Sequence, residues 1–206
     1  MSRIFAIGVL FAFGALHAPP AAAQSTYHFN SSNSSIEVNV YKEGVFSAFG
    51  HNHIIRANDV SGTVQFDPNH VDNSSVALQV RAASLAVVDP DASASDRQQV
   101  QATMLGPQVL DTARYPDISF RSTQVTDVKQ QGGGWRVTLI GILQIHGTQR
   151  AVSFPLTVNV AGGELLAEGE VFVLQTDFGI TPIKVAGGTV KVKDRLRIHF
   201  NIHARQ

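Results

Sequence analysis

The sequence predicts an all-β protein, a closed antiparallel barrel of about eight strands with one short helical insertion. Apolar and polar residues alternate over most of the chain from Tyr27 onward, as they do in half-buried antiparallel strands. Turn-forming residues separate these stretches at short intervals. A single sheet of this many strands either leaves two exposed edges or closes on itself, and closure removes the edges.

The alternation is clearest in the last segment of the chain. There, Lys, Arg and His residues alternate with Val190, Val192, Leu196, Ile198, Phe200 and Ile202. The same period covers residues 36–40 and 152–160. Further strands are expected near residues 56–67, 74–84, 117–129, 135–146 and 165–177.

One segment has the features of a helix. Ser93 and Asp96 resemble a capping box, good helix formers follow up to Leu105, and Gly106 and Pro107 end the run. We therefore expect a helix over residues 96–105. It either caps a mouth of the barrel or forms a surface crossover without ligand contact. In the first case the residues that face the barrel are Val100, Met104 and Leu110.

The first 23 residues have the features of an export signal. Arg3 precedes an apolar run from residue 4 to residue 16, and three small residues, 21–23, follow it. We expect cleavage before Gln24 and a periplasmic protein, the alternative being an uncleaved N-terminal anchor. Residues 24–206 then suit one domain. No later stretch approaches the roughly 20 apolar residues of a spanning helix, so permanent membrane insertion is not expected.

The composition excludes several classes of function. The 16 Lys and Arg residues balance 16 Asp and Glu residues and form no basic run, so nucleic acid is not an expected partner. The chain has no Cys, and its stability must come from an apolar core instead of disulfides. It also lacks a Gly-x-Ser-x-Gly motif, a His-Glu-x-x-His motif and a Gly-rich phosphate loop. We therefore expect neither an enzyme nor a required cofactor.

The interior of an eight-stranded barrel is either filled by its own side chains or holds one slender ligand. Large apolar residues are abundant, but such residues are more often core than ligand wall. They are Phe46, Phe49, Phe66, Phe120, Phe154, Phe172, Phe178 and Phe200. Alternation alone leaves both alternatives open, including a filled barrel that binds only other proteins.

Four sequence blocks resemble the YceI-like family and occur in the family's order. They are residues 60–68 (VSGTVQFDP), 114–123 (RYPDISFRST), 141–148 (GILQIHGT) and 177–180 (DFGI), and the resemblance spans nearly all of residues 26–203. It implies a lipocalin-like barrel, exported to the periplasm, that holds a polyisoprenoid or another long amphiphile in an apolar tunnel. It implies binding and no reaction.

Two regions depart from the family pattern. Gln175 stands where many relatives have Arg, and the helical insertion between Asp89 and Leu110 matches the family only loosely. The segment before Arg56 is shorter than in well-known relatives. We therefore expect the contacts to the ligand's head group and the geometry of the barrel mouth to differ.

Strand parity, together with the expected mouth near residues 46–54, selects the candidate ligand-binding residues. About half of them are expected to touch the lipid. The sequence leaves open whether the protein forms a homodimer. The candidates are Val38, Val40, Phe46, Phe49, His53, Ile54, Val64, Phe66, Leu78, Val80, Met104, Ile118, Phe120, Phe154, Phe178, Ile198 and Phe200.

His51 and His53 lie two residues apart and share a face of an extended strand. One hypothesis is a metal-binding or redox-assisting protein that uses this pair with His146 or His70 as a third ligand. The other is that these histidines orient a lipid head group or satisfy loop hydrogen bonds. Asp177, beside a Phe-Gly pair, is expected to cap a turn, because Asp accepts backbone donors near Gly.

Overall fold

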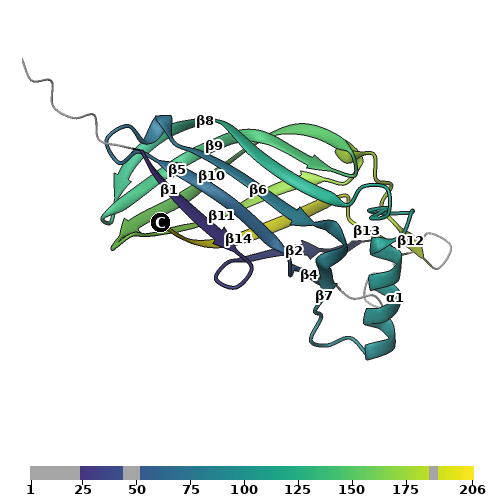
Figure 1. The fold of residues 1–206 in the computed structure, drawn as a ribbon. Coiled ribbons are helices and arrows are strands. Elements are labelled where there is room, and N and C mark those ends of the chain that lie inside the picture. Colours follow the sequence, from purple (N-terminus) through teal and green to yellow (C-terminus); the bar gives the residue numbers. More distant parts are fainter. Residues whose placement is uncertain (1–23, 44–51, 186–189) are drawn as a thin grey trace, which may run out of the picture.

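The computed structural model of the chain describes residues 24–43, 52–185 and 190–206. It confirms the closed antiparallel barrel (Figure 1). The wall consists of β1 (Ser25–Asn30), β5 (Val60–Phe66), β6 (Ser75–Arg81), β8 (Asp117–Gln131), β9 (Gly134–Ile145), β10 (Thr148–Ala161), β11 (Glu164–Leu174) and β14 (Arg195–Arg205), in this spatial order. Strand β14 also pairs with β1, and this contact closes the barrel.

The long hairpin strands show why the chain folds this way. On β9, Val137, Leu139, Gly141, Leu143 and Ile145 are buried, while the alternate residues between them are partly exposed. The same period of two continues on β10 and β11. One face of each strand therefore points into the barrel and the other toward water.

Strand β14 has two different partners on one of its edges. It pairs with β11 along its whole length, and on the other side with β2 (Ser35–Val40) over residues 197–201. Its contact with β1 is one residue pair, His28 with Arg205. Strand β2 pairs in turn with β4 (His53–Ala57), and β4 with β7 (Leu85–Val87). Strands β2, β4 and β7 therefore continue the sheet from the part of this β14 edge that β1 does not cover.

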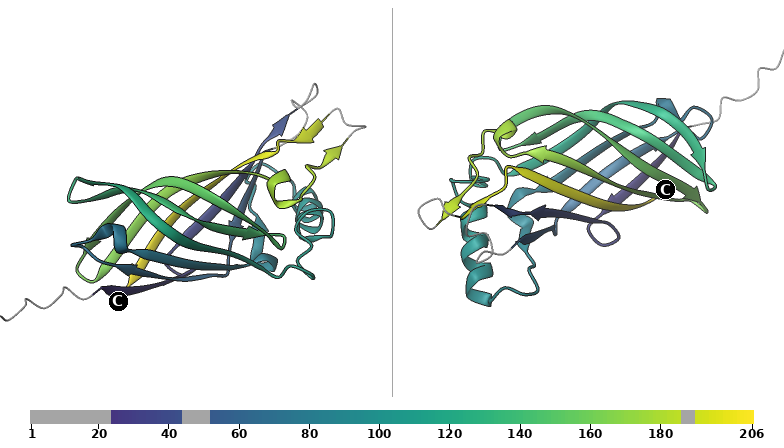
Figure 2. Two further views of the ribbon diagram at one scale, coloured as in Figure 1. Left: turned by 90° about the horizontal axis from the view of Figure 1, so that it is seen from above. Right: turned by 180° about the vertical axis from the view of Figure 1, so that it is seen from behind.

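The helix α1 (Ala94–Leu105) confirms the predicted helix and begins two residues earlier than expected. The Ser93 side chain accepts a hydrogen bond from the Asp96 backbone N–H at 3.1 Å, which caps the helix. A small sheet of β3 (Lys42–Glu43), β12 (Lys184–Val185) and β13 (Val190–Val192) lies at the same end of the barrel (Figures 1 and 2). We call this end the mouth end.

The expected terminal strand is divided in two. Val190 and Val192 belong to the small sheet, and β14 begins only at Arg195. The division occurs at residues 193 and 194, because the Lys193 N–H donates to the Tyr41 carbonyl oxygen at 2.7 Å and the Asp194 side chain turns to another segment.

The Asp194 side chain turns to the short 3-10 helix η4 (Thr176–Phe178), and β11 ends before this helix, earlier than expected. Two further single-turn helices are η2 (Val71–Asn73) and η3 (Ala82–Ser84). Asp194 accepts from the Thr176 N–H at 2.9 Å and from the Thr176 hydroxyl at 2.6 Å. The left-handed Gly179 (φ 74°) ends the turn. The prediction that Asp177 caps this turn is therefore wrong, because the stabilising carboxylate is that of Asp194, directly before β14.

Some of the predicted residues and segments fall outside the described ranges. Phe46, Phe49 and His51 lie outside the described residues, as does the expected export signal. Across the three described ranges, no helix combines the length and apolar character needed to cross a membrane.

Close packing against the strand backbone gives a first prediction. A Cβ atom at Gly62 would lie 2.2 Å from the Cζ atom of the buried Phe29 ring and 2.6 Å from the Ala77 carbonyl oxygen. Gly62→Ala should therefore lower the free energy of unfolding by about 1–3 kcal/mol, as overpacking does. The neighbouring exposed Ser61 is the control, and Ser61→Ala should change it by less than about 0.5 kcal/mol. Urea denaturation measures both, and equal stability of the two variants would contradict this packing.

Candidate binding site in the barrel interior

Two cavities lie end to end inside the barrel. The mouth cavity has a volume of about 420 Å³ and the deep cavity a volume of about 150 Å³. Along β14, Leu196 lines the mouth cavity, Ile198 lines both and Phe200 lines the deep cavity. Along β8, Ile118 lines the mouth cavity and Phe120 the deep one. The interior is therefore hollow in two successive compartments.

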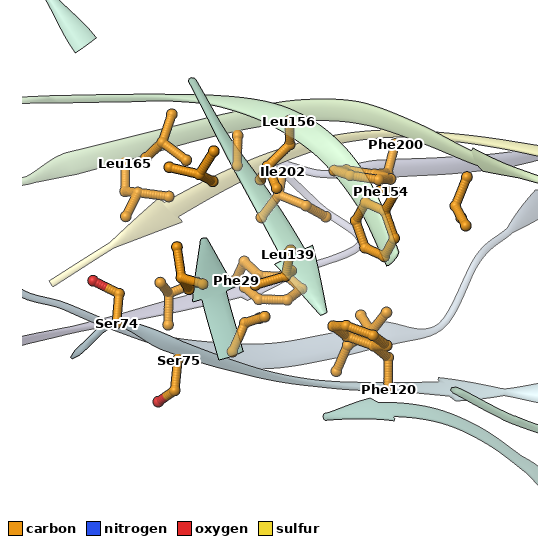
Figure 3. A pocket seen from close by; sticks show the side chains of 18 of the residues that line it. Phe29, Ser74, Ser75, Phe120, Leu139, Phe154, Leu156, Leu165, Phe200 and Ile202 are labelled. Atoms are coloured by element: carbon orange, nitrogen blue, oxygen red, sulfur yellow. The ribbon is translucent and has the colours of Figure 1, made fainter. Parts of the chain in front are cut away.

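The deep cavity has an almost wholly apolar lining, contributed by inward residues from strands around the barrel (Figure 3). Its polar lining residues are Ser74 and Ser75, at the end near Leu165. An apolar cavity of roughly 150 Å³ stays dry and admits a molecule of about the size of benzene. This compartment can hold a short stretch of hydrocarbon but offers little to orient a polar group.

Three aromatic rings stand at the opposite end of the deep cavity (Figure 3). The ring centroids of Phe120 and Phe154 are 5.6 Å apart, and those of Phe154 and Phe200 are also 5.6 Å apart. Phe120 and Phe200 follow, at the next inward position, the residues Ile118 and Ile198 of the mouth cavity. We call these three residues the aromatic belt, and it lies where the two compartments meet.

The mouth cavity is bounded by β2, β4, α1 and the η4 turn. Val100 and Met104 of α1 line it, as does Leu110, so the helix caps the mouth and is not a detached surface crossover. Phe178, which is almost fully buried, contributes from the η4 turn. The volume of this cavity falls in the range of small-molecule sites, roughly 300–1,000 Å³.

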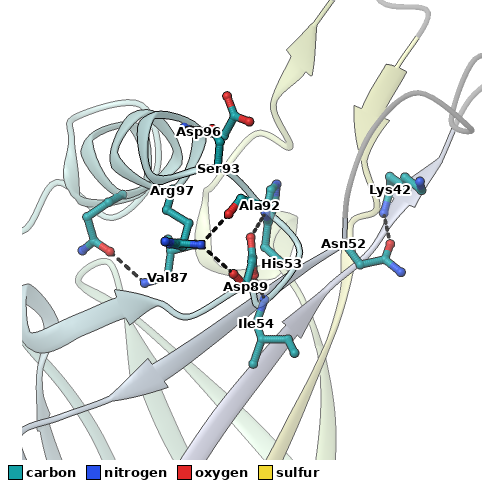
Figure 4. Close-up of polar contacts among 11 residues, drawn as sticks. Lys42, Asn52, His53, Ile54, Val87, Asp89, Ala92, Ser93, Asp96 and Arg97 are labelled. Atoms are coloured by element: carbon teal, nitrogen blue, oxygen red, sulfur yellow. Dashed lines mark hydrogen bonds and ion pairs between the residues drawn. The ribbon is translucent and has the colours of Figure 1, made fainter.

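A buried carboxylate stands beside the mouth cavity (Figure 4). Asp89 is 4% exposed, and its Oδ2 lies 2.6 Å from Nδ1 of His53, which lines the cavity. Its Oδ1 accepts the Ile54 backbone N–H at 2.5 Å. Arg97 of α1 donates to the backbone carbonyl oxygens of Asp89, at 3.1 Å, and Ala92. The dyad of His53 and Asp89 is thus tied both to β4 and to the capping helix.

A second buried polar side chain lines the mouth cavity. Gln175 is 7% exposed, and its Nε2 donates to the Lys193 carbonyl oxygen at 2.9 Å. Lys191 also contributes to the lining, and its Nζ is 2.8 Å from the Glu43 carboxylate. Further polar residues of the lining are Tyr41, Lys42, Asp96, Gln99 and Thr103. The polar groups of the interior are therefore concentrated at the mouth end.

The structure places most of the predicted ligand-binding residues in these linings. Ile198 lines both cavities, and Val80 is buried in the core without lining either cavity. Phe46 and Phe49 lie outside the described residues. The deep cavity contains Val64, Phe66, Leu78, Phe120, Phe154 and Phe200, and the mouth cavity contains Val38, Val40, His53, Met104, Ile118 and Phe178.

The inward position assigned to Ile54 belongs to its neighbour. Ile55 lines the mouth cavity, whereas Ile54 lines neither cavity. The reason is the register between β2 and β4, in which Val38 is opposite Ile55 and Asn39 is opposite Ile54. Paired residues share a face of the sheet, and Val38 faces inward.

Other lining residues were missing from the prediction. Those on β9, β10 and β11 follow the same alternation, and extending the parity argument to these strands finds Val137, Leu139, Leu143, Leu156, Val158, Leu165, Ala167 and Val171. Asp89 is different, because 36 residues separate it from His53 and no local pattern connects the two.

Among the described residues, the three histidines of the metal hypothesis have separate hydrogen-bond or ion-pair partners. His53 is bonded to Asp89, Nδ1 of His70 is 3.6 Å from Asp67, and Nδ1 of His146 is 3.3 Å from the Phe178 carbonyl oxygen. Neither candidate third ligand joins His53 in a metal site, because among the described residues no three His, Cys, Asp or Glu side chains are grouped as such a site requires. His51 lies outside the described residues.

Comparison with known proteins accounts for both the sequence blocks and the barrel. The model of the YceI-like domain matches residues 27–204. The chain belongs to the YceI-like domain family. None of the curated proteins with which it was compared matches it.

Solved structures share the fold of this YceI-like chain at low sequence identity. BcnA of Burkholderia cenocepacia is 19% identical with a TM-score of 0.68, covering 85% of this chain and 98% of its own. A polyisoprenoid binding domain from Saccharophagus degradans, implicated in plant cell wall breakdown, is 10% identical with a TM-score of 0.60, covering 88% and 98%. The YCEI protein of Campylobacter jejuni is 11% identical with a TM-score of 0.53, covering 100% and 99%.

The buried carboxylate generates a second prediction. Asp89→Ala removes the acceptor of the Ile54 N–H and of the His53 ring, so the free energy of unfolding should fall by about 1–3 kcal/mol. Asp91→Ala, at an exposed position nearby, should change it by less than about 0.5 kcal/mol. Denaturant titration followed by circular dichroism gives both values. A stability loss that is the same at both positions would show that Asp89 is not a buried acceptor.

Proposed function

We propose that the protein is a periplasmic carrier that holds a long-chain amphiphile, an isoprenoid or a similar lipid, inside the barrel. One observation carries this proposal: the hollow interior is apolar at its deep end and polar at its mouth. The tail would lie along the deep cavity and past the aromatic belt, and the head group would lie at the mouth beside His53 and Gln175.

The physical chemistry of the interior supports a hydrocarbon ligand. Transfer of each methylene from water into an apolar site is favourable by about 0.8 kcal/mol, so even a short buried stretch of tail contributes several kcal/mol. Ordering the tail opposes part of this gain. The deep cavity presents no strong donor or charge that would favour a polar ligand instead.

The relatives support the same class of ligand. The Saccharophagus degradans neighbour is described as a polyisoprenoid binding domain, and its fold is shared across nearly the whole described barrel. The proposed role is binding without a reaction. It fits a site whose polar groups are few and whose volume is shaped by strand side chains.

Export belongs to the proposal as well and gives a third prediction. Residues 1–23 carry the features of a cleaved signal, and a periplasmic location follows from them. Intact-mass analysis of the protein from a bacterial periplasmic extract should give a chain that begins at Gln24. A full-length chain that stays with the membrane fraction would support the uncleaved anchor instead.

The lipid itself gives the fourth prediction. Organic extraction of the purified protein, followed by mass spectrometry, should release a long-chain lipid in stoichiometric amount. Ala167 lines the deep cavity, so Ala167→Phe should fill part of it and shift the bound population toward shorter tails.

Leu166 is the matched control, because it is the next residue on β11, is 45% exposed and points outward. Leu166→Phe should leave both the amount and the length of the bound lipid unchanged. A barrel that releases no lipid, or an Ala167→Phe variant with the same lipid profile as the unmodified protein, would count against a tail in the deep cavity.

A further inference from the structure

The dyad of His53 and Asp89 determines which kind of hydrogen bond the mouth cavity can offer. A carboxylate is an acceptor at both of its oxygens. Oδ1 of Asp89 accepts the Ile54 N–H, and Oδ2 lies 2.6 Å from Nδ1 of His53. The proton of this contact therefore resides on Nδ1, an assignment that follows from the hydrogen-bond network.

In a neutral ring protonated at Nδ1, the other nitrogen, Nε2, is an acceptor. The His53 side chain is 21% exposed and lines the mouth cavity. Among the described residues, nothing hydrogen-bonds to its Nε2. The ring thus offers an acceptor to whatever occupies the mouth.

Gln175 offers a second acceptor, independently of the dyad. Its amide N–H donates to the Lys193 carbonyl oxygen at 2.9 Å, which assigns the orientation of the amide. The remaining polar atom of that side chain is Oε1, again an acceptor. His53 and Gln175 therefore both offer an acceptor to a donor group of the ligand.

The dyad is also held in place before any ligand binds. Ile54 belongs to β4, which pairs with β2, and Arg97 links the Asp89 backbone to the helix α1 (Figure 4). A preorganised acceptor discriminates more strongly than a mobile one, because it cannot turn away from a ligand group that does not match it.

We propose that the mouth cavity selects amphiphiles whose head group is a hydroxyl donor, an alcohol or a phenol, and that this hydroxyl donates to Nε2 of His53. The inference rests on the proposed carrier function and specifies its head-group class. Lys42 and Lys191 also line the cavity, the latter paired with Glu43, so an anionic head group is the competing outcome.

Asp89→Asn tests this tautomer directly. The asparagine Oδ1 can still accept the Ile54 N–H, and its amide nitrogen then faces Nδ1 of His53 and donates to it. The ring proton moves to Nε2, which becomes a donor. The variant should therefore lose the preference for a hydroxyl over a carbonyl, because both groups can accept from Nε2.

The probes share one tail and differ in the head group: geranylgeraniol, geranylgeranial, geranylgeranyl phosphate and the hydrocarbon of the same length. Trp135 packs against Phe66 of the deep cavity, with ring centroids 5.1 Å apart, so its fluorescence reports tail binding. All four probes are titrated at pH 8.

The unmodified protein should bind the alcohol about tenfold or more tightly than the aldehyde. Asp89→Asn should abolish this difference, and Asp91→Asn, at an exposed position, should keep it. Nitrogen-15 NMR of the ring, assigned with His53→Gln, should show the proton on Nδ1 in the unmodified protein, and this holds whether or not Asp89→Asn folds.

Three results with the unmodified protein would overturn the inference: equal affinity for alcohol and aldehyde, tightest binding of the phosphate, or a ring proton on Nε2. In each of these cases the carrier function would stand, because the tail still binds. Failure of all four probes, including the hydrocarbon, would overturn the carrier function itself.

Discussion

The pairing of strand β14 shapes the whole interior. This strand is 11 residues long, whereas β1 and β2 have six residues each, so one edge of β14 meets two shorter strands in succession. Near its C-terminus it pairs with β1 and closes the barrel. Nearer its N-terminus it pairs with β2, which leads to β4 and β7, and the helix α1 covers the region beyond them.

This change of partner explains why the interior has two unlike compartments. Around the deep cavity, the wall is a continuous set of hydrogen-bonded strands, and their inward side chains are apolar. Around the mouth cavity, part of the wall is helix and turn, and these elements bring polar side chains such as Gln99 and Gln175 to the lining. The gradient from apolar to polar thus follows from how the wall is built.

Much of this could be read from the sequence, because strand burial has a period of two. The alternation identified the barrel strands and placed most of the predicted ligand-binding residues correctly in the linings, and the capping residues identified α1. Parity failed at β4 because Ile54 and Ile55 are both apolar, and only the pairing with β2 decides which one faces inward. The place of α1 was open because its few apolar residues form no marked stripe along the helix, so the sequence does not show which face packs.

The dyad of His53 and Asp89 could not be predicted from the sequence, for a different reason. His53 and Asp89 are far apart in the chain and meet only because β4 passes the segment that leads into α1. Asp194 likewise takes the role expected of Asp177, because β14 returns beside the end of β11. Contacts of this kind depend on tertiary neighbours, which no local spacing encodes.

The single residue pair between β1 and β14 has a further consequence for how the wall can move. Strands separate most easily where few backbone hydrogen bonds join them, and such regions open without global unfolding. Six residue pairs hold β1 to β5, against one pair, His28 with Arg205, on its other side. This junction lies at the end of the barrel opposite the mouth (Figure 1). It is therefore the part of the closed wall where local opening breaks the fewest backbone pairs.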